Sequence, residues 1–132
     1  MTVHPSPDHE LVRLPSTPAA APYSNASVLD RLIFTAGVLP VRGDGTTPDE
    51  FADQVRQALG NLEQVLAAAG ADWGSVLKVN GYVTDIQRLP ELNAVYTEVL
   101  GIDALPPRTT VEVPRFRGAT MVEFDAVAYR RA

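Results

Sequence analysis

The chain of 132 residues is 45% hydrophobic and 20% charged, which predicts one soluble globular domain with a hydrophobic core. Its net charge of −5 at pH 7 argues against a nucleic-acid-binding protein, because such proteins present a basic surface to the phosphate backbone. The sequence contains no cysteine, which excludes thiol nucleophiles, disulfides and thiolate metal sites.

The first residues of the chain show no targeting signal. They are polar and contain proline, and no apolar run in the sequence approaches the roughly 18 residues that span a bilayer. We therefore expect a cytoplasmic protein whose single domain, residues 1–132, begins with a flexible leader at residues 1–8. His4 and His9 lie in or beside this leader, where side chains seldom hold a fixed geometry. For that reason we expect neither a histidine triad nor a metal site.

The N-terminal part of the sequence predicts a hairpin. Residues 10–14 have the composition of a short strand, and a proline-rich connection follows at 15–24. In the segment 26–40, two apolar runs flank Asp30 and Arg31, which is the pattern of two strands joined by a tight turn.

The clearest predicted helix lies at residues 47–70. Thr47 and Glu50 have the spacing of a capping box, Pro48 suits the first helical position, and Gly70 suits the end. Apolar residues recur every three or four positions and form one stripe that we expect to pack in the core: Phe51, Val55, Leu59, Leu62, Val65, Leu66 and Ala69.

The C-terminal part alternates strands with one further helix. We predict a strand at 75–86, in which Gly81 marks a bulge or the close approach of another segment. A second, shorter helix follows at 87–101, and strands at 108–113 and 120–130 close the domain.

This order of elements predicts an α+β fold, with a single mixed β-sheet and two helices packed on one face. The strand segments 31–38, 108–113 and 121–128 carry apolar residues on both faces. Because two helices suffice for one face, we expect the other face to be buried against another subunit in an oligomer.

Two charged residues on the last predicted strands are candidates for chemistry. Arg108 stands at the start of a strand, where it is either a solvated end residue or a clamp for a carboxylate. Glu123 alternates with apolar residues, so it is either a member of a structural ion pair or a site residue. An antiparallel pairing of the two strands would bring Arg108 and Glu123 together. They would then form a salt bridge or hold a small carboxylate substrate between them.

Six segments carry a family resemblance: PYSNA (22–26), LIFTAGVLP (32–40), FADQVRQALGNLEQVLAAAG (51–70), NAVYTEVLG (93–101), PPRTTVEV (106–113) and MVEFDAVA (121–128). They resemble the RidA/YjgF family of enamine and imine deaminases, from about residue 20 to the C-terminus. The most specific elements are the proline–arginine entry into a strand and the glutamate of the last strand.

The resemblance implies a homotrimer of chorismate-mutase-like subunits with clefts between neighbours. It also implies hydrolysis of 2-imino acids, or of their enamine tautomers, to 2-keto acids and ammonia. This chemistry requires neither a metal nor an organic cofactor. A protein that binds a keto acid as a sensor, without turnover, is the alternative, because the same cleft serves both. Ribonuclease activity, described for some relatives, is disfavoured by the acidic charge balance.

The functional residues of the family fall on five positions of this chain. Arg108 matches the arginine that binds the substrate carboxylate, and Glu123 matches the glutamate that handles the water and the imine nitrogen. Tyr23, Gly37 and Asn93 match further residues of the cleft. Without the resemblance, these three have ordinary interpretations as a packing residue, a bulge and a surface helix residue.

Two positions depart from the family pattern. Ala36 stands where many relatives have serine, and Thr110 stands where many have cysteine. Neither change removes the carboxylate clamp, but both are expected to alter the range of substrates. We also expect backbone N–H groups near Gly37 and Thr110 to help bind the substrate.

Overall fold

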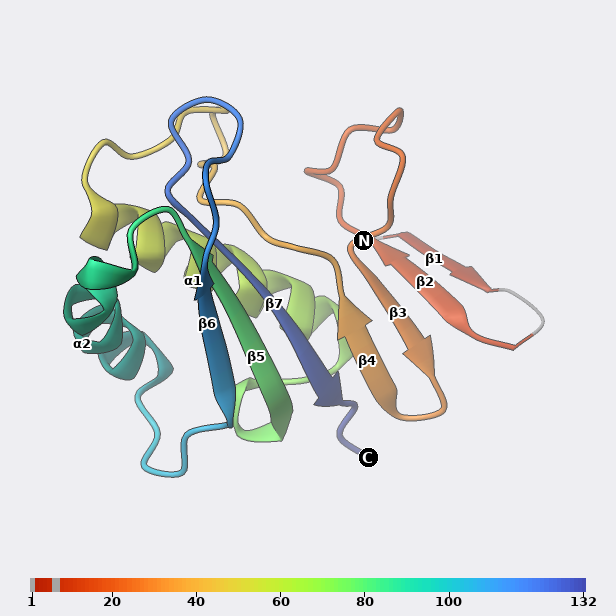
Figure 1. The fold of residues 1–132 in the computed structure, drawn as a ribbon. Coiled ribbons are helices and arrows are strands. Elements are labelled where there is room, and N and C mark those ends of the chain that lie inside the picture. The colour runs from red at the N-terminus through yellow and green to blue at the C-terminus, as the bar shows by residue number, and fades with distance from the viewer. Residues whose placement is uncertain (1, 6–7) are drawn as a thin grey trace.

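A mixed β-sheet carries α-helices on one of its faces (Figure 1) in the computed structural model, which describes residues 2–5 and 8–132. Within these residues one sheet has seven strands, in the spatial order β1-β2-β3-β4-β7-β5-β6. The strands are β1 (Thr2–Pro5), β2 (Glu10–Arg13), β3 (Ala26–Leu29), β4 (Leu32–Thr35), β5 (Val76–Val83), β6 (Arg108–Glu112) and β7 (Val122–Tyr129). The predicted α+β class with a single mixed sheet is confirmed.

The strand order separates the two strands that the sequence analysis placed side by side. β5 and β6 are parallel neighbours at the sheet edge, joined by helix α2 (Leu89–Leu100) as the crossover that parallel strands require. β7 lies on the other side of β5 and pairs in antiparallel fashion with β5 and β4. The predicted pairing that would bring Arg108 next to Glu123 is therefore wrong.

Both α-helices of the described chain lie on the same side of the sheet, as predicted (Figure 1). Helix α1 (Phe51–Ala69) packs against α2 and β7, and it also touches β3 and β4. Two short 3-10 helices, η1 (Trp73–Ser75) and η2 (Ile86–Arg88), precede β5 and α2. No helix of the described residues is long and apolar enough to cross a membrane.

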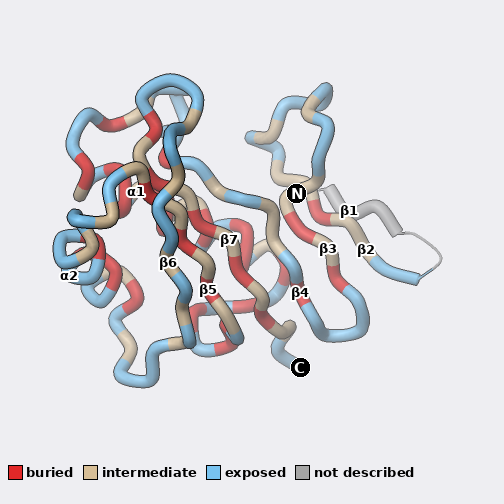
Figure 2. The backbone as a smooth tube through the Cα atoms, in the orientation of Figure 1, coloured by how far each residue is buried: buried red, intermediate tan, exposed pale blue. Residues whose placement is uncertain are grey.

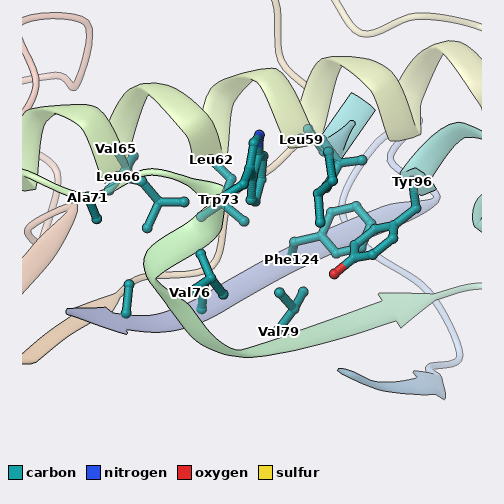
Figure 3. Close-up of a cluster of buried hydrophobic side chains, with 14 of the residues drawn as sticks. Leu59, Leu62, Val65, Leu66, Ala71, Trp73, Val76, Val79, Tyr96 and Phe124 are labelled. Atoms are coloured by element: carbon teal, nitrogen blue, oxygen red, sulfur yellow. The ribbon is translucent and has the colours of Figure 1, made fainter. Parts of the chain in front are cut away.

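The core fills the space between this helix layer and the sheet (Figures 2 and 3). In β7, Val122, Phe124, Ala126 and Ala128 face the helices and are at most 2% exposed. Burying one large apolar side chain contributes about 1.5–3 kcal/mol, so the core fixes which face of β7 points away from the helices. The predicted stripe of α1 supplies the other side of the core, including Leu59, Leu62 and Leu66 (Figure 3).

Helix α1 ends as predicted but begins later than predicted. Gly70 ends it in the left-handed conformation, with φ of 92°. The helix starts at Phe51, and its N-cap residue, Glu50, makes no side-chain capping bond, so the capping box at Thr47 is wrong. The reason is Gln54, whose buried amide donates to the carbonyls of Pro48 (2.8 Å) and Ala119 (2.9 Å) and thereby ties the preceding residues to a loop.

Two further predictions concern the leader and Gly81. Thr2–Pro5 form strand β1, paired with β2, inside the segment 1–8 that we expect to be a flexible leader; residues 1, 6 and 7 of that leader lie outside the described residues. The bulge of β5 lies between Val76 and Lys78 and not at Gly81. Gly81 instead marks a close approach, because a Cβ there would lie 3.3 Å from the Phe124 ring and from Thr110 Oγ1.

The sheet face opposite the helices, hereafter the open face, exposes large apolar side chains. Leu29, Leu32, Phe34 and Val111 are 42–48% exposed, and register places them on the side away from the buried residues of β7. Leu29, Leu32 and Phe34 belong to β3 and β4, which form the hairpin predicted at Asp30. An apolar face of this kind is typical of a protein–protein interface.

Candidate active site

Arg108, at the start of β6, lies on the helix side of the sheet. It pairs with Val79, which is fully buried under the helices, and paired residues of parallel strands point to the same face. Its guanidinium lies 4.6 Å from the centre of the Tyr96 ring, and Nη2 donates a hydrogen bond of 2.5 Å to Oδ1 of Asn93. Asn93 and Tyr96 are one helical turn apart on α2, so a single helix face orients the guanidinium.

Most of the hydrogen-bonding capacity of Arg108 is unused in the isolated chain. A guanidinium has five N–H donors, and among the described residues only Asn93 accepts from it. No described carboxylate lies within ion-pair distance of Arg108. The side chain is therefore oriented and half-buried, with donors left for an incoming anion.

Two buried hydroxyls accompany Arg108 on the helix side. Tyr96 is 2% exposed, its hydroxyl has no hydrogen-bond partner, and burial raises its pKa against the opposing charge of Arg108. Thr110, two residues along β6, has a buried Oγ1 that also lacks a partner. Leaving such a group unpaired costs about 1–3 kcal/mol. We call Arg108, Asn93, Tyr96 and Thr110 the arginine cluster.

Glu123 lies on the open face of β7, directly against the backbone of Gly37. An isolated bridge between Val38 and Phe124, with N–O distances of 2.7 and 3.2 Å, holds the two segments together. A Cβ on Gly37 would lie 2.4 Å from Glu123 Oε2, so a larger residue there would push the end of the Glu123 side chain out of its present position. Burial raises the pKa of Glu123, and the nearby charge of Asp125 raises it further.

Tyr23 borders the same region from the proline-rich loop. Arg13 organises this loop, because its guanidinium donates to the carbonyls of Tyr23 (2.5 Å) and Pro18 (2.8 Å). Tyr23 is 52% exposed, and together with Gly37 it lines a cavity of about 500 Å³. Amide side chains of α1, including Asn61, line the cavity as well, so the cavity reaches the helix side of the sheet, and Glu123 is not among its lining residues. We call Glu123 and Gly37, which are in direct contact, the glutamate cluster.

The two clusters lie on opposite faces of the sheet. β5 separates β6 from β7, so Arg108 and Glu123 are about 10 Å apart across the strands, with a further offset of three residues along them. The direct salt bridge considered from the sequence does not form within the chain. One small ligand cannot touch both groups within a single chain.

Some residues of this region were not found from the sequence. Tyr96 follows Asn93 by three positions on a helix, a spacing that predicts a shared face but not which strand that face meets. Arg13 was assigned to a strand without a role. The described residues contain no group of three or more histidine, aspartate or glutamate side chains placed to bind a metal ion.

A single mixed sheet with helices on one face is the architecture of the Rid-family structures to which this chain is similar. The family model described as Endoribonuclease L-PSP matches residues 14–130, and the chain therefore belongs to this family, which is the YjgF/RidA family of the sequence resemblance. The residues before position 14 lie outside the match.

Two relatives and one solved structure illustrate the similarity, and the first of them has a name that concerns deamination. The 2-iminobutanoate/2-iminopropanoate deaminase of Escherichia coli is 33% identical over 120 residues, which cover 88% of this chain and 94% of that protein. A RutC family protein of Pyrococcus horikoshii is 34% identical over 111 residues, covering 83% and 87%. The crystal structure of E. coli TdcF with bound serine superposes with a TM-score of 0.83 at 29% identity, covering 92% of this chain and 98% of that one.

Replacing Gly37 with alanine tests the position of Glu123. The new Cβ would displace the flexible end of the Glu123 side chain, and we expect turnover to fall by about 10- to 100-fold with little change in melting temperature. Gly43→Ala is the matched control, because a Cβ there meets no atom within 4 Å. Equal turnover in both variants would show that Glu123 needs no fixed position.

Proposed function

We propose that this protein hydrolyses 2-imino acids, or their enamine tautomers, to 2-keto acids and ammonia in the cytoplasm. The observation that carries the proposal is the pair of clusters. One holds an oriented guanidinium with free donors, and the other holds a carboxylate whose pKa is raised by burial. A 2-imino acid requires both, because it has a carboxylate to bind and a C=N bond that must gain and lose protons.

The two clusters meet only between subunits. We propose a homotrimer in which the open face of one subunit packs against the β6 edge of the next, so that Arg108 of one subunit faces Glu123 of its neighbour. The exposed apolar side chains on the open face supply a reason for association, because leaving them in water is unfavourable. Closed rings built from one repeated contact are the ordinary form of such assemblies.

In the assembled cleft, Arg108 binds the substrate carboxylate through two N–H groups, and Asn93 and Tyr96 keep the guanidinium in place. Backbone N–H groups near Gly37 and Thr110 supply further donors, while Tyr23 closes one side. These residues bind and orient the substrate. The 2-imino carbon is then held beside Glu123.

Glu123 exchanges protons with water and with the nitrogen. It takes a proton from water as the water oxygen bonds to the imine carbon, and it gives a proton to the nitrogen. Glu123 then accepts the hydroxyl proton of the resulting carbinolamine and passes a proton to its amino nitrogen, so that the C–N bond breaks, the C=O bond forms, and ammonia and the 2-keto acid are released. The reaction consumes one water and releases one ammonia, and the chain needs no metal or organic cofactor for any of these steps.

The direct test is ammonia release from freshly generated imino acids derived from several amino acids. We expect release well above the rate in buffer, with a preference among side chains, and loss of this excess in Arg108→Ala. Rates equal to buffer for all substrates would contradict the proposed activity.

A keto-acid sensor of the same fold is the second candidate. The serine bound in the crystal structure of the related TdcF favours it, because serine is a small molecule that carries a carboxylate. Calorimetric titration with 2-ketobutyrate separates the two candidates: binding without any ammonia release identifies a sensor. Endoribonuclease activity, the description of the family model, is disfavoured by the net charge of −5.

The assembly itself can be measured. Light scattering at micromolar concentration should give a mass three times the 14.2 kDa of the chain. Phe34→Glu places a charge in the apolar part of the open face and is expected to dissociate the trimer, whereas Glu63→Gln on exposed α1 surface should not. A mass of one chain for the unaltered protein would contradict the trimer.

A further inference from the structure

A second carboxylate lies on the same face and the same strand as Glu123. Asp125 is two residues further along β7, so its side chain points to the open face about 7 Å from that of Glu123 along the strand. Asn80 Nδ2 and Tyr82 Oη each donate a hydrogen bond of 2.7 Å, to the two different oxygens of Asp125. Both donors come from β5, the neighbouring strand.

Both partners present donors to the carboxylate of Asp125. An ionised carboxylate only accepts hydrogen bonds, and both of its partners here are donors. The pKa of Tyr82 is raised to about 12, chiefly by its bond to Asp125, so the phenol keeps its proton at neutral pH. The two hydrogen bonds also orient the carboxylate of Asp125 toward β5 and hold it on the same face as Glu123.

Titratable groups of the described residues flank Glu123 from the neighbouring strand. On the open face, β5 contributes Tyr82, which pairs with Glu123, and Lys78, which donates to Thr109 of β6. On the other side, the backbone of Gly37 lies against the Glu123 carboxylate. Burial is the larger cause of the raised pKa of Glu123, and the negative charge of Asp125 is the second cause.

The trimer proposed above adds one opposing charge. Arg108 of the neighbouring subunit would face Glu123, and a guanidinium favours the ionised form of a carboxyl group. A glutamate held too strongly in its ionised form would be a weak base toward water and would seldom hold the proton that it passes to the nitrogen. A fixed negative charge beside Glu123 offsets the influence of the guanidinium.

We propose that Asp125, held by Asn80 and Tyr82, is a positioning residue that keeps a negative charge beside Glu123 and so lets Glu123 carry the proton for the nitrogen. The role rests on the proposed deaminase function, but the electrostatic part does not require turnover. Tyr82 and Asn80 act through Asp125, whose carboxylate they orient.

The test is an NMR titration of the Glu123 carboxyl carbon in the full-length protein. We expect Asp125→Asn to move the Glu123 midpoint to lower pH, because one of the two causes that raise it is removed. Asp125→Ser has a different shape and should give a shift in the same direction. Asp125→Glu keeps the charge and should retain most of the original midpoint, and Glu63→Gln, which removes an exposed charge on α1, should leave it unchanged.

Activity gives a second and separate readout. The acidic limb of kcat/KM against pH should move to lower pH in Asp125→Asn, while KM for the substrate changes little because Arg108 is intact. Unchanged Glu123 midpoints in both folded neutral variants, Asp125→Asn and Asp125→Ser, would overturn the proposal and leave Asp125 a structural role only. If the unaltered protein releases no ammonia, the deaminase function fails, and the NMR shift still decides whether Asp125 controls the protonation of Glu123.

Discussion

Replacing Arg108 with lysine is expected to lower kcat/KM by roughly 30- to 1000-fold, which corresponds to about 2–4 kcal/mol for a lost charge-assisted bidentate contact. Lysine keeps the charge but loses the planar fork. It also loses the geometry that Asn93 and Tyr96 support, because both contacts are made to a guanidinium. The loss should fall on carboxylate binding, so the affinity for 2-ketobutyrate should drop in parallel.

Steady-state kinetics and calorimetric titration with 2-ketobutyrate measure the two effects. Arg56→Lys is the matched control, because Arg56 is an exposed arginine of α1 whose ion pairs, with Asp53 and Glu98, lie on the surface. Surface ion pairs of this kind contribute about 1 kcal/mol or less. Full ligand affinity in folded Arg108→Lys and Arg108→Ala would end the clamp hypothesis.

Replacing Glu123 with glutamine is expected to reduce turnover by about 10²- to 10⁴-fold, the usual effect of removing one acid–base group. Glutamine keeps the shape that fits against Gly37, so 2-ketobutyrate should still bind. The rate and the affinity therefore separate in this variant, whereas they fall together in Arg108→Lys. Glu63→Gln serves as the control for loss of a carboxylate elsewhere.

A salt bridge between Arg108 and Glu123 of neighbouring subunits is the competing account. In that case the two residues would hold the trimer together and take no part in chemistry. Both variants would then lose melting temperature and trimer mass together, and the remaining folded protein would bind 2-ketobutyrate normally. Melting curves and light scattering on the same samples separate the two accounts.

The elements that the sequence predicts well are those fixed by neighbouring residues. The stripe of α1 and the left-handed Gly70 at its end follow from local spacing and from one glycine. The turn between β3 and β4 is also local, since two apolar runs flank Asp30. The alternation of β7 places Glu123 and Asp125 on one face, because period-two patterns survive in a half-buried strand.

The predictions that failed depend on distant contacts. The capping box at Thr47 was overridden by Gln54, which bonds to the carbonyl of Ala119 across the fold. The order of β5, β6 and β7 follows from the crossover through α2, which no pattern within the strands specifies. The bonds from Asn80 and Tyr82 to Asp125 require the register between β5 and β7, so the alternation of each strand alone could not reveal them.

The central claim is that Arg108 and Glu123 act together only across a subunit boundary, and a mixing experiment tests it most directly. Arg108→Ala and Glu123→Gln, each nearly inactive, are co-expressed in equal amounts, and mass spectrometry confirms that mixed trimers form. If each cleft takes one residue from each of two neighbours, about one quarter of the clefts in a random mixture contain both intact residues, and about one quarter of the unaltered activity should return. If the two residues act within one chain, no chain in the mixture has both of them intact, so activity should not return. Mixed trimers with no activity above that of the separate variants would therefore contradict the account.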